Sequence, residues 1–204
     1  MGASTGGFTD CLLQRGALQV IAIDVGQGIL DWKLRQDPRV IVMEQTNARF
    51  VEHLPRPVDL VTIDASFISL KILLPVVKGW LTDADSGGGS VIALVKPQFE
   101  AGRSLVARGK GVIRDPAVHQ QIVEDVLNFA RSIGYSLHGL IRSPILGPKG
   151  NVEFLAYFRS PARAGMTVQE LLEHCFVQEQ PEITTASLPL QQAFIVEEEN
   201  DGKT

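Results

Sequence analysis

Residues 90–96 read SVIALVK, and together with VDLVTID at 58–64 and GNVEFLAYF at 150–158 this run decides the fold. Short runs of β-branched and aliphatic residues predict buried strands. Each of the three runs carries one ionisable residue inside it or at its end, namely Asp64, Lys96 and Glu153. A charge in such a run is costly unless it is paired or used, so the three together predict a built site.

The three runs belong to a longer alternation of strand-like and helix-like segments, which is typical of βα units around a parallel sheet. We expect strands near 18–24, 39–43, 58–64, 90–96, 136–142 and 152–158, and helices near 7–16, 27–35, 46–53, 66–82 and 116–134. The last helix is the clearest, because Asp115 and Pro116 start it and Gly134 ends it. We expect His119, near its start, to face solvent.

The last two strand runs follow each other without a helix, across the turn-rich segment SPILGPKGN at 143–151. Such a connection predicts an antiparallel hairpin. The expected architecture is therefore an α/β, Rossmann-like fold in one domain, with a mostly parallel sheet that ends in a hairpin. Beyond Arg159 the pattern weakens, although residues 167–176 could form one helix and 191–200 a last strand.

The composition is that of a globular domain: 204 residues, 45% hydrophobic and 21% charged. No apolar run approaches the roughly 20 residues of a membrane helix, and the first residues lack the pattern of a secretory signal. We therefore expect a cytoplasmic protein that does not engage a membrane. Cys11 and Cys175 show no metal-ligand spacing, which favours reduced thiols and no metal site.

Charge is distributed unevenly along the chain. The net charge of −4 argues against a protein that binds nucleic acid over its whole surface. One local strip between residues 100 and 115 is nonetheless basic, through Arg103, Arg108, Lys110 and Arg114. From composition alone, a nucleic-acid contact and a solvated loop are equally good interpretations of this strip.

The chain opens with GASTGGF at 2–8, where small residues let the backbone approach a ligand closely. Asp24 closes the next apolar run, and an acidic residue at that place can accept hydrogen bonds from ribose hydroxyls. The alternative for Asp24 is a helix cap. Given the glycines upstream, we favour the nucleoside role. This pairing fits NAD as well as S-adenosylmethionine.

The reaction centre discriminates between these cofactors. Asp64 and Lys96 end neighbouring strands and Glu153 lies on the hairpin, so all three could meet over one cleft. A lysine there could orient or deprotonate a hydroxyl while the carboxylates position it. Taken singly, each residue is better explained by a structural ion pair.

The motifs GASTGGFTD, IDVGQG, EQTNAR, DLVTIDASFISL, LVKPQFE and GNVEFLAYF resemble those of the FtsJ-like RNA 2′-O-ribose methyltransferases, most closely the TlyA or hemolysin A subgroup. The resemblance runs from Gly2 to about Arg159. It implies a methyltransferase domain over 1–160 with an extension over 161–204, and S-adenosylmethionine as cofactor. It assigns Asp64, Lys96 and Glu153 to the second, third and fourth members of a Lys-Asp-Lys-Glu catalytic set.

The same resemblance implies the cofactor site and the partner. The cofactor-binding residues would be Gly2, Ser4, Gly6, Gly7, Phe8, Asp24, Val25 and Asp64. The substrate would be a ribose 2′-hydroxyl of ribosomal RNA, with the basic strip on phosphates and a ribosomal subunit as partner. The alternative is an inactive module that binds cofactor or RNA. A cytolysin is not favoured, because no long apolar segment or evident amphipathic membrane helix is found.

Relative to the family, we expect an N-terminally shortened chain without the small S4-like domain, the first catalytic lysine and the strand that precedes the glycine loop. A gap at the centre of a parallel sheet would leave two rows of backbone groups unpaired. Three candidates could fill it: residues 193–197 (AFIVE), a segment of a partner chain in a homo-oligomer, or local disorder around the glycine loop.

Overall fold

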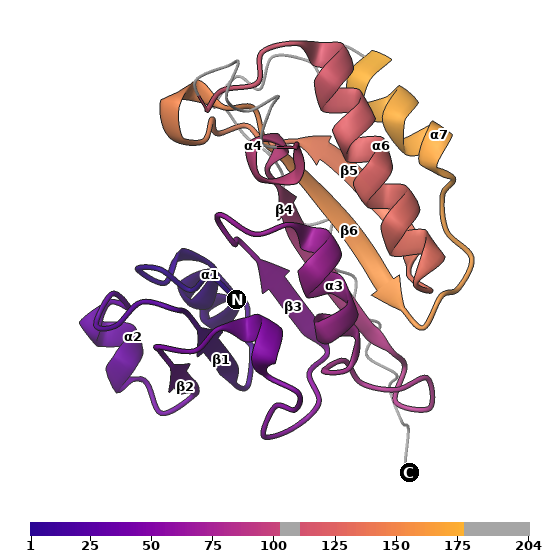
Figure 1. The fold of residues 1–204 in the computed structure, drawn as a ribbon. Coiled ribbons are helices and arrows are strands. Elements are labelled where there is room, and N and C mark those ends of the chain that lie inside the picture. The colour runs from indigo at the N-terminus through magenta and orange to yellow at the C-terminus, as the bar shows by residue number, and fades with distance from the viewer. Residues whose placement is uncertain (103–110, 178–204) are drawn as a thin grey trace.

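A computed structural model of the chain describes residues 1–102 and 111–177, and Figure 1 shows its ribbon. The strands are β1 (Val20–Ile23), β2 (Val40–Met43), β3 (Leu60–Ile63), β4 (Gly89–Val95), β5 (Ser136–Arg142) and β6 (Phe154–Ser160). The helices are α1 (Gly7–Gln14), α2 (Trp32–Gln36), α3 (Leu70–Lys78), α4 (Pro97–Glu100), α6 (Pro116–Ser132) and α7 (Val168–Leu172). Single turns form η1 (Ala48–Phe50), η2 (Pro148–Gly150) and the π-helical η3 (Glu173–Val177).

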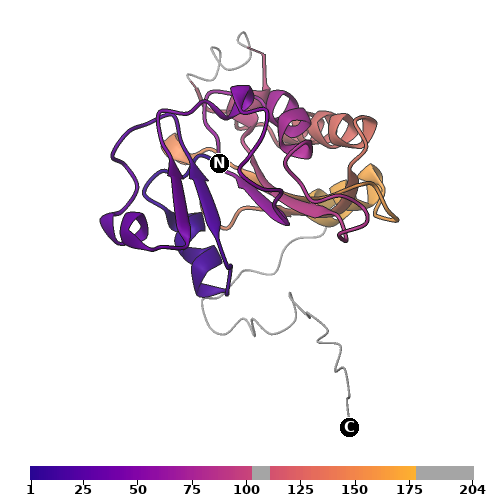
Figure 2. The same cartoon turned by 90° about the horizontal axis from the view of Figure 1, so that it is seen from below.

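The strands form two sheets. One has the order β3-β4-β6-β5, in which β3 and β4 are parallel and β6 runs antiparallel to both of its neighbours. The expected C-terminal hairpin is thereby confirmed. The other sheet pairs β1 with β2 in parallel. The N-terminus lies between the two sheets in both views (Figures 1 and 2).

The break between the sheets falls between β1 and β3, the place where the sequence predicts a missing strand. Residues Met1–Ala3 lie in this gap only at the carboxyl ends of β1 and β3. Ala3 N donates to Ile23 O at 3.1 Å on one side, and Asp64 N donates to Met1 O at 3.1 Å on the other. Three residues of chain therefore bridge the two sheets by backbone hydrogen bonds at the carboxyl ends of β1 and β3.

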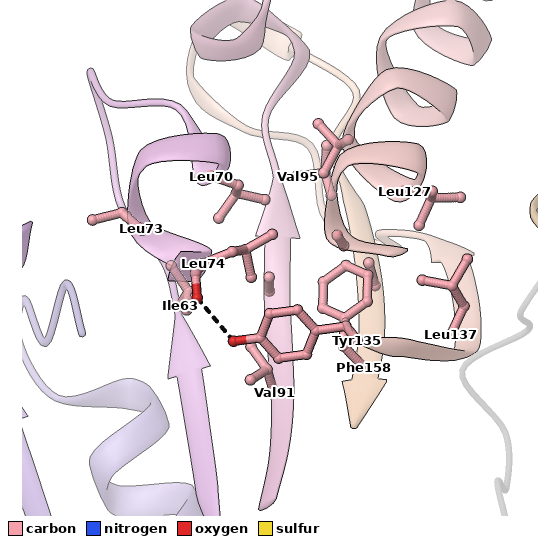
Figure 3. Packing of buried hydrophobic residues seen from close by; sticks show 14 of the residues in the cluster. Ile63, Leu70, Leu73, Leu74, Val91, Val95, Leu127, Tyr135, Leu137 and Phe158 are labelled. Carbon is pink, nitrogen blue, oxygen red and sulfur yellow. Dashed lines mark hydrogen bonds between the residues drawn. The ribbon is translucent and has the colours of Figure 1, made fainter. Parts of the chain in front are cut away.

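The main hydrophobic core lies between the four-stranded sheet and the helices α3, α6 and α7, which pack side by side. Figure 3 shows its centre, where the Tyr135 hydroxyl donates to Leu74 O at 2.9 Å and so ties the end of α6 to α3. The extension to Val177 packs on this core through Val168, Leu171 and Leu172. A second, smaller cluster joins α1 and α2 to β1 through Leu13, Val20, Ala22, Leu30 and Leu34.

Several expected helices are shorter than the sequence indicates. The helix predicted over 46–53 is wrong: only the 3-10 turn η1 forms, since Leu54 precedes Pro55 and is biased toward extended backbone. The helix predicted over 27–35 begins at Trp32, because the Asp31 side chain accepts from Lys33 N and so caps it there. The strand expected over 191–200 lies outside the described residues.

His119 is buried, which contradicts the expectation that it faces solvent. It is 4% exposed, and one ring nitrogen lies 2.9 Å from Ile113 O. The ring packs edge-on against Phe154 of β6, because α6 lies flat on the sheet from its first turn. Within the described parts of the chain, no helix is long and apolar enough to cross a lipid bilayer.

Candidate active site

The reaction centre is built on Lys96, which follows β4 and caps the short helix α4. The residue is 8% exposed. Its Nζ donates to Asp64 Oδ1 at 2.6 Å and to Ser66 Oγ at 3.1 Å. Asp64 and Ser66 follow β3, the parallel neighbour of β4, so strand order brings these three groups together. The result is a buried ammonium group with two oxygen partners at the carboxyl edge of the sheet.

Glu153 lies near this centre but does not contact Lys96 directly. It precedes β6, is 5% exposed, and accepts a hydrogen bond from Gln98 Nε2 at 2.9 Å. Both residues are described, and the Lys96 Nζ and the Glu153 carboxylate oxygens are more than 4.0 Å apart, so they form no ion pair. The structure therefore joins Asp64 and Lys96, and it links Glu153 to them through the turn of chain that carries Gln98.

Helix α4 fixes this turn of chain from its other end. The Glu100 carboxylate accepts from Ser69 Oγ at 2.5 Å and from Leu70 N at 2.7 Å, at the start of α3. Burial raises the pKa of this carboxyl group above its ordinary value. The segment KPQFE thus supplies a charged group, a partner for Glu153 and an anchor to α3 within five consecutive residues. The sequence analysis missed the roles of Gln98 and Glu100, because a polar residue in a four-residue helix has no periodic signal.

The glycine loop lies directly against the reaction centre. Gly2 has φ +68°, and a Cβ at this position would lie 2.0 Å from the Asp64 carbonyl oxygen. Gly6 caps α1 with φ +109° and without a side-chain hydrogen bond. A Cβ on Gly7 would meet no atom within 4 Å, so the first residue of α1 faces open space. The N-terminal amides of this eight-residue helix follow directly on the glycine loop, where they could bind an anionic group.

Asp24 joins two loops at the mouth of this site. Its Oδ2 accepts from Ser4 N and its Oδ1 from Gly26 N, each at 2.8 Å. Asp24 therefore does not cap a helix, since the next helix, α2, is capped by Asp31; each of its carboxylate oxygens retains a free lone pair. Val25, the next residue, is 69% exposed, and Phe8 in the first turn of α1 is 36% exposed. Exposed apolar atoms beside a carboxylate and free helix amides fit a nucleoside that carries a charged tail.

A second acidic residue, Glu44, fixes the loop that follows Asp24. Glu44 follows β2, and its Oε2 accepts from Gly28 N at 2.9 Å. Its Oε1 pairs with the Arg35 guanidinium at 2.6 Å. The guanidinium lowers the pKa of the Glu44 carboxyl group to about 2. Glu44 thereby holds the loop after Asp24 in place, a role that its position at the end of an apolar run could have indicated.

Phe67 is the most conspicuous residue that the sequence analysis did not single out. It has a left-handed backbone (φ +63°), which is rare for a bulky residue, and its side chain is 90% exposed. Its ring lies 4.8 Å from that of Phe99, and Lys96 Nζ lies 6.0 Å from the Phe99 centroid. An aromatic pair, with Phe67 exposed and Phe99 half-buried, therefore borders the reaction centre.

The basic strip is only partly described. Arg114 is exposed and immediately precedes the cap of α6. Arg103, Arg108 and Lys110 lie outside the described residues. Their expected contact with nucleic acid stays a prediction.

The FtsJ-like methyltransferase model matches residues 1–160. The chain is 46% identical over 173 residues to the 16S/23S rRNA (cytidine-2′-O)-methyltransferase TlyA of Mycobacterium tuberculosis. The matched region makes up 83% of this chain and 62% of that relative. The chain is 40% identical over 164 residues to Hemolysin A of Brachyspira hyodysenteriae, covering 78% of this chain and 65% of that protein. The chain thus spans about three fifths of the length of these curated relatives.

Solved structures agree with this relationship. A protein of Lactococcus lactis, provisionally named a hemolysin, superposes with TM-score 0.75 at 45% identity, over 85% of this chain and 84% of that one. The N-methyltransferase NodS of Bradyrhizobium japonicum, solved with S-adenosyl-L-homocysteine, shares the fold at TM-score 0.54 and 14% identity, over 78% of this chain and 75% of that one. The expected Rossmann-like methyltransferase fold is confirmed. The chain belongs to the FtsJ-like methyltransferase family.

Proposed function

We propose that this chain transfers a methyl group from S-adenosylmethionine to a ribose 2′-hydroxyl of ribosomal RNA. The observation that carries the proposal is the buried Lys96 ammonium group, held 2.6 Å from Asp64 beside the glycine loop. The name of the M. tuberculosis relative, an rRNA (cytidine-2′-O)-methyltransferase, supports the same reaction and substrate class. Membership of the family supports methyl transfer in general.

The residues around the glycine loop fit S-adenosylmethionine. The amides at the start of α1 would bind the carboxylate of its methionine part, and Asp24 would accept from its ribose hydroxyls. Phe8 and Val25 offer exposed apolar atoms to the adenosine. When bound, this cofactor supplies an electrophilic methyl group on sulfur, which passes to oxygen as the carbon–sulfur bond breaks. The close approach of Gly2 to the Asp64 backbone would bring the glycine loop, which would hold the cofactor, next to the residue that pairs with Lys96.

Lys96 would orient the ribose hydroxyl by hydrogen bonding, and its neutral amine form, after loss of one proton to solvent, would take up the hydroxyl proton as the methyl group is transferred. Asp64 would stabilise the ammonium form that results, since its Oδ1 already contacts Nζ. Ser66 would hold Nζ in one direction through its hydroxyl. Glu153 would act through Gln98, which keeps the chain after Lys96 in place.

Two surfaces would bind the RNA. Arg114 and the neighbouring basic residues Arg103, Arg108 and Lys110 would contact phosphates, which position an RNA without reading its sequence. The ring pair of Phe67 and Phe99 would stack on the target nucleoside, as exposed aromatic side chains do for unstacked bases.

Labelled-methyl transfer from S-adenosylmethionine to purified ribosomal subunits tests the proposal. We expect transfer with the native chain, and a loss of at least about 100-fold with Lys96→Met, the typical size of an acid–base contribution. Lys33→Met is the matched control, because Lys33 is exposed on α2. Calorimetric titration with S-adenosylmethionine and with NAD should show binding of the former alone. Binding without transfer to any ribosomal RNA would favour the alternative of an inactive cofactor-binding module.

A further inference from the structure

Two buried polar side chains that the proposed mechanism does not use hold residues 111–114 in place. Asn151 and His119 are each 4% exposed. Asn151 Oδ1 accepts from Ile113 N at 3.3 Å, and Asn151 Nδ2 donates to Gly111 O at 3.1 Å. A ring nitrogen of His119 donates to Ile113 O at 2.9 Å. Because Ile113 is bonded at both its amide and its carbonyl, the chain is fixed where it enters Arg114 and helix α6.

Asn151 also bonds to the turn between β5 and β6. Its Nδ2 donates to Pro148 O at 3.0 Å, and Gly147 N donates to its main-chain carbonyl oxygen at 2.8 Å. An asparagine amide group has two hydrogens, so Nδ2 uses one on the turn and the other on Gly111. A single buried side chain therefore locks the turn 147–151 against residues 111–113.

This turn lies at the reaction centre. Val95 of β4 pairs with Phe154 of β6. Lys96 follows the first of these residues and Glu153 precedes the second, so both lie at one edge of the sheet. In Figure 1 the orange chain between β5 and β6 lies at the end of the sheet that carries α4. A Cβ on Gly147 would overlap Glu153 Oε1, so the backbone of the turn packs directly on this carboxylate. The position of the turn therefore sets the position of Glu153.

Lys149, in the middle of the turn, has an unusual backbone conformation. It lies in the left-handed region, with φ +59° and ψ +18°, and its side chain is exposed. Glycine adopts this conformation without strain, whereas a lysine is strained there and stays only because its surroundings hold it. Here the hydrogen bond from Asn151 to Pro148 O holds the turn. Such an outlier indicates that the lysine side chain has a role that glycine would not supply.

Two exposed cationic side chains, those of Lys149 and Arg114, belong to the segments that Asn151 joins. A Cβ on Gly111 would lie 3.8 Å from Lys149 Nζ, so the ammonium group lies against the segment that leads to Arg114. Across residues 1–102 and 111–177, neither cation has a carboxylate within 4.0 Å. Exposed cations without an acidic partner at the rim of a reaction centre are suited to bind a phosphate group.

We propose that Lys149 and Arg114 bind the phosphate backbone of the RNA, and that Asn151 is a positioning residue that fixes this contact relative to Glu153. The inference rests on the proposed function, since the phosphates are those of the RNA strand that is methylated. Each ribose is bonded to a phosphate, so a fixed phosphate contact restricts where the 2′-hydroxyl can lie beside Lys96. Lys149 thereby extends the RNA contact from the basic strip to the hairpin.

The salt dependence of RNA binding tests the phosphate contact. Fluorescence anisotropy with a labelled single-stranded RNA of mixed sequence is suitable, because phosphate contacts do not read sequence. We expect Lys149→Gly to weaken binding about tenfold and to reduce the slope of log K against log salt concentration by about 0.7. Lys149→Arg should keep both values, since it keeps the charge. Tm should not fall in Lys149→Gly, because glycine relieves the left-handed backbone. Lys33→Met, on α2, is the control and should leave RNA binding unchanged.

A second comparison tests the positioning role of Asn151. Asn151→Ala and Asn151→Ser each break the link between the two segments. In either background, Lys149→Gly should weaken RNA binding by less than about twofold, because the lysine is no longer held at the rim. Tyr135→Phe is the control, since it also loses a buried hydrogen bond but at the opposite end of the sheet. In that background the full loss of about tenfold should remain.

An unchanged salt slope in Lys149→Gly would overturn the phosphate contact. A full loss of affinity from Lys149→Gly in the Asn151 variants would overturn the positioning role. Methyl transfer by the native chain is measured in parallel, so that failure of the proposed function is seen separately. Transfer with an unchanged salt slope in Lys149→Gly would refute only the phosphate contact, whereas the expected slopes without any transfer would refute only the proposed function.

Discussion

Substitution of Asp64 by asparagine should destabilise the protein and abolish transfer for one electrostatic reason. At 2.6 Å and an effective dielectric constant of about 20, the attraction between Lys96 and Asp64 amounts to about 6 kcal/mol. Desolvation of the lysine offsets much of it, and the Asp64 side chain is 35% exposed, so solvent screens part of the remainder. We expect Asp64→Asn to lower the free energy of unfolding by about 2 kcal/mol and Tm by roughly 4–8 °C.

A double-mutant cycle isolates this interaction. Lys96→Met leaves a carboxylate that water can reach, and we expect it to cost about 1 kcal/mol. The double variant should be no less stable than Lys96→Met alone, because it carries neither the buried Lys96 charge nor the Asp64 carboxylate that Lys96→Met leaves unpaired. Urea unfolding of the four proteins measures the coupling, and Asp59→Asn, on an exposed residue at the start of the same strand, is the control. Additive effects, within about 0.5 kcal/mol, would refute the reasoning.

Three further predictions test other parts of the site. Gly2→Ala should weaken S-adenosylmethionine binding at least about tenfold in calorimetry, because its Cβ would overlap a carbonyl oxygen after β3; Gly87→Ala, at a similar positive φ in open space, should not. Phe67→Ala should raise the KM for RNA about tenfold and leave cofactor affinity unchanged, whereas Phe50→Ala, at another exposed phenylalanine, should change neither. Because the folded chain holds the Met1 amine at a pKa of about 6 rather than 8.0, the unfolded chain binds more protons between pH 6 and 8. The free energy of unfolding should therefore rise by about 2 kcal/mol over this window, and a flat profile in urea titrations would contradict the burial of this amine.

Strand positions were predictable because most strands are short runs of apolar residues between polar turns. All six expected strands form, within two residues of the predicted boundaries. Helix lengths were less predictable, because the apolar spacing over 46–53 and 27–35 does not show where a capping side chain or a proline intervenes. Burial of His119 could not be deduced either, since it depends on how closely the first turn of α6 packs against β6.

The site was predictable where strand order alone decides contact. Asp64 and Lys96 meet because they end adjacent parallel strands. The position of Glu153 depends on the register of the hairpin and on its hydrogen bond with Gln98. No pattern in the sequence predicts either of these. Phe67 was missed because its exposure arises from a left-handed backbone, and a phenylalanine after an apolar strand is ordinarily core. The sequence analysis did anticipate the break between β1 and β3, which belong to two separate sheets.

The most direct test of the proposed reaction is to locate the transferred methyl group. Ribosomal RNA incubated with the chain and methyl-labelled S-adenosylmethionine would be digested to nucleosides and analysed by mass spectrometry. Our account predicts the label on the ribose of one nucleoside, at O2′, and its loss with Lys96→Met. Label on a base, or label on ribose that persists in Lys96→Met, would contradict the role assigned to the Lys96–Asp64 pair.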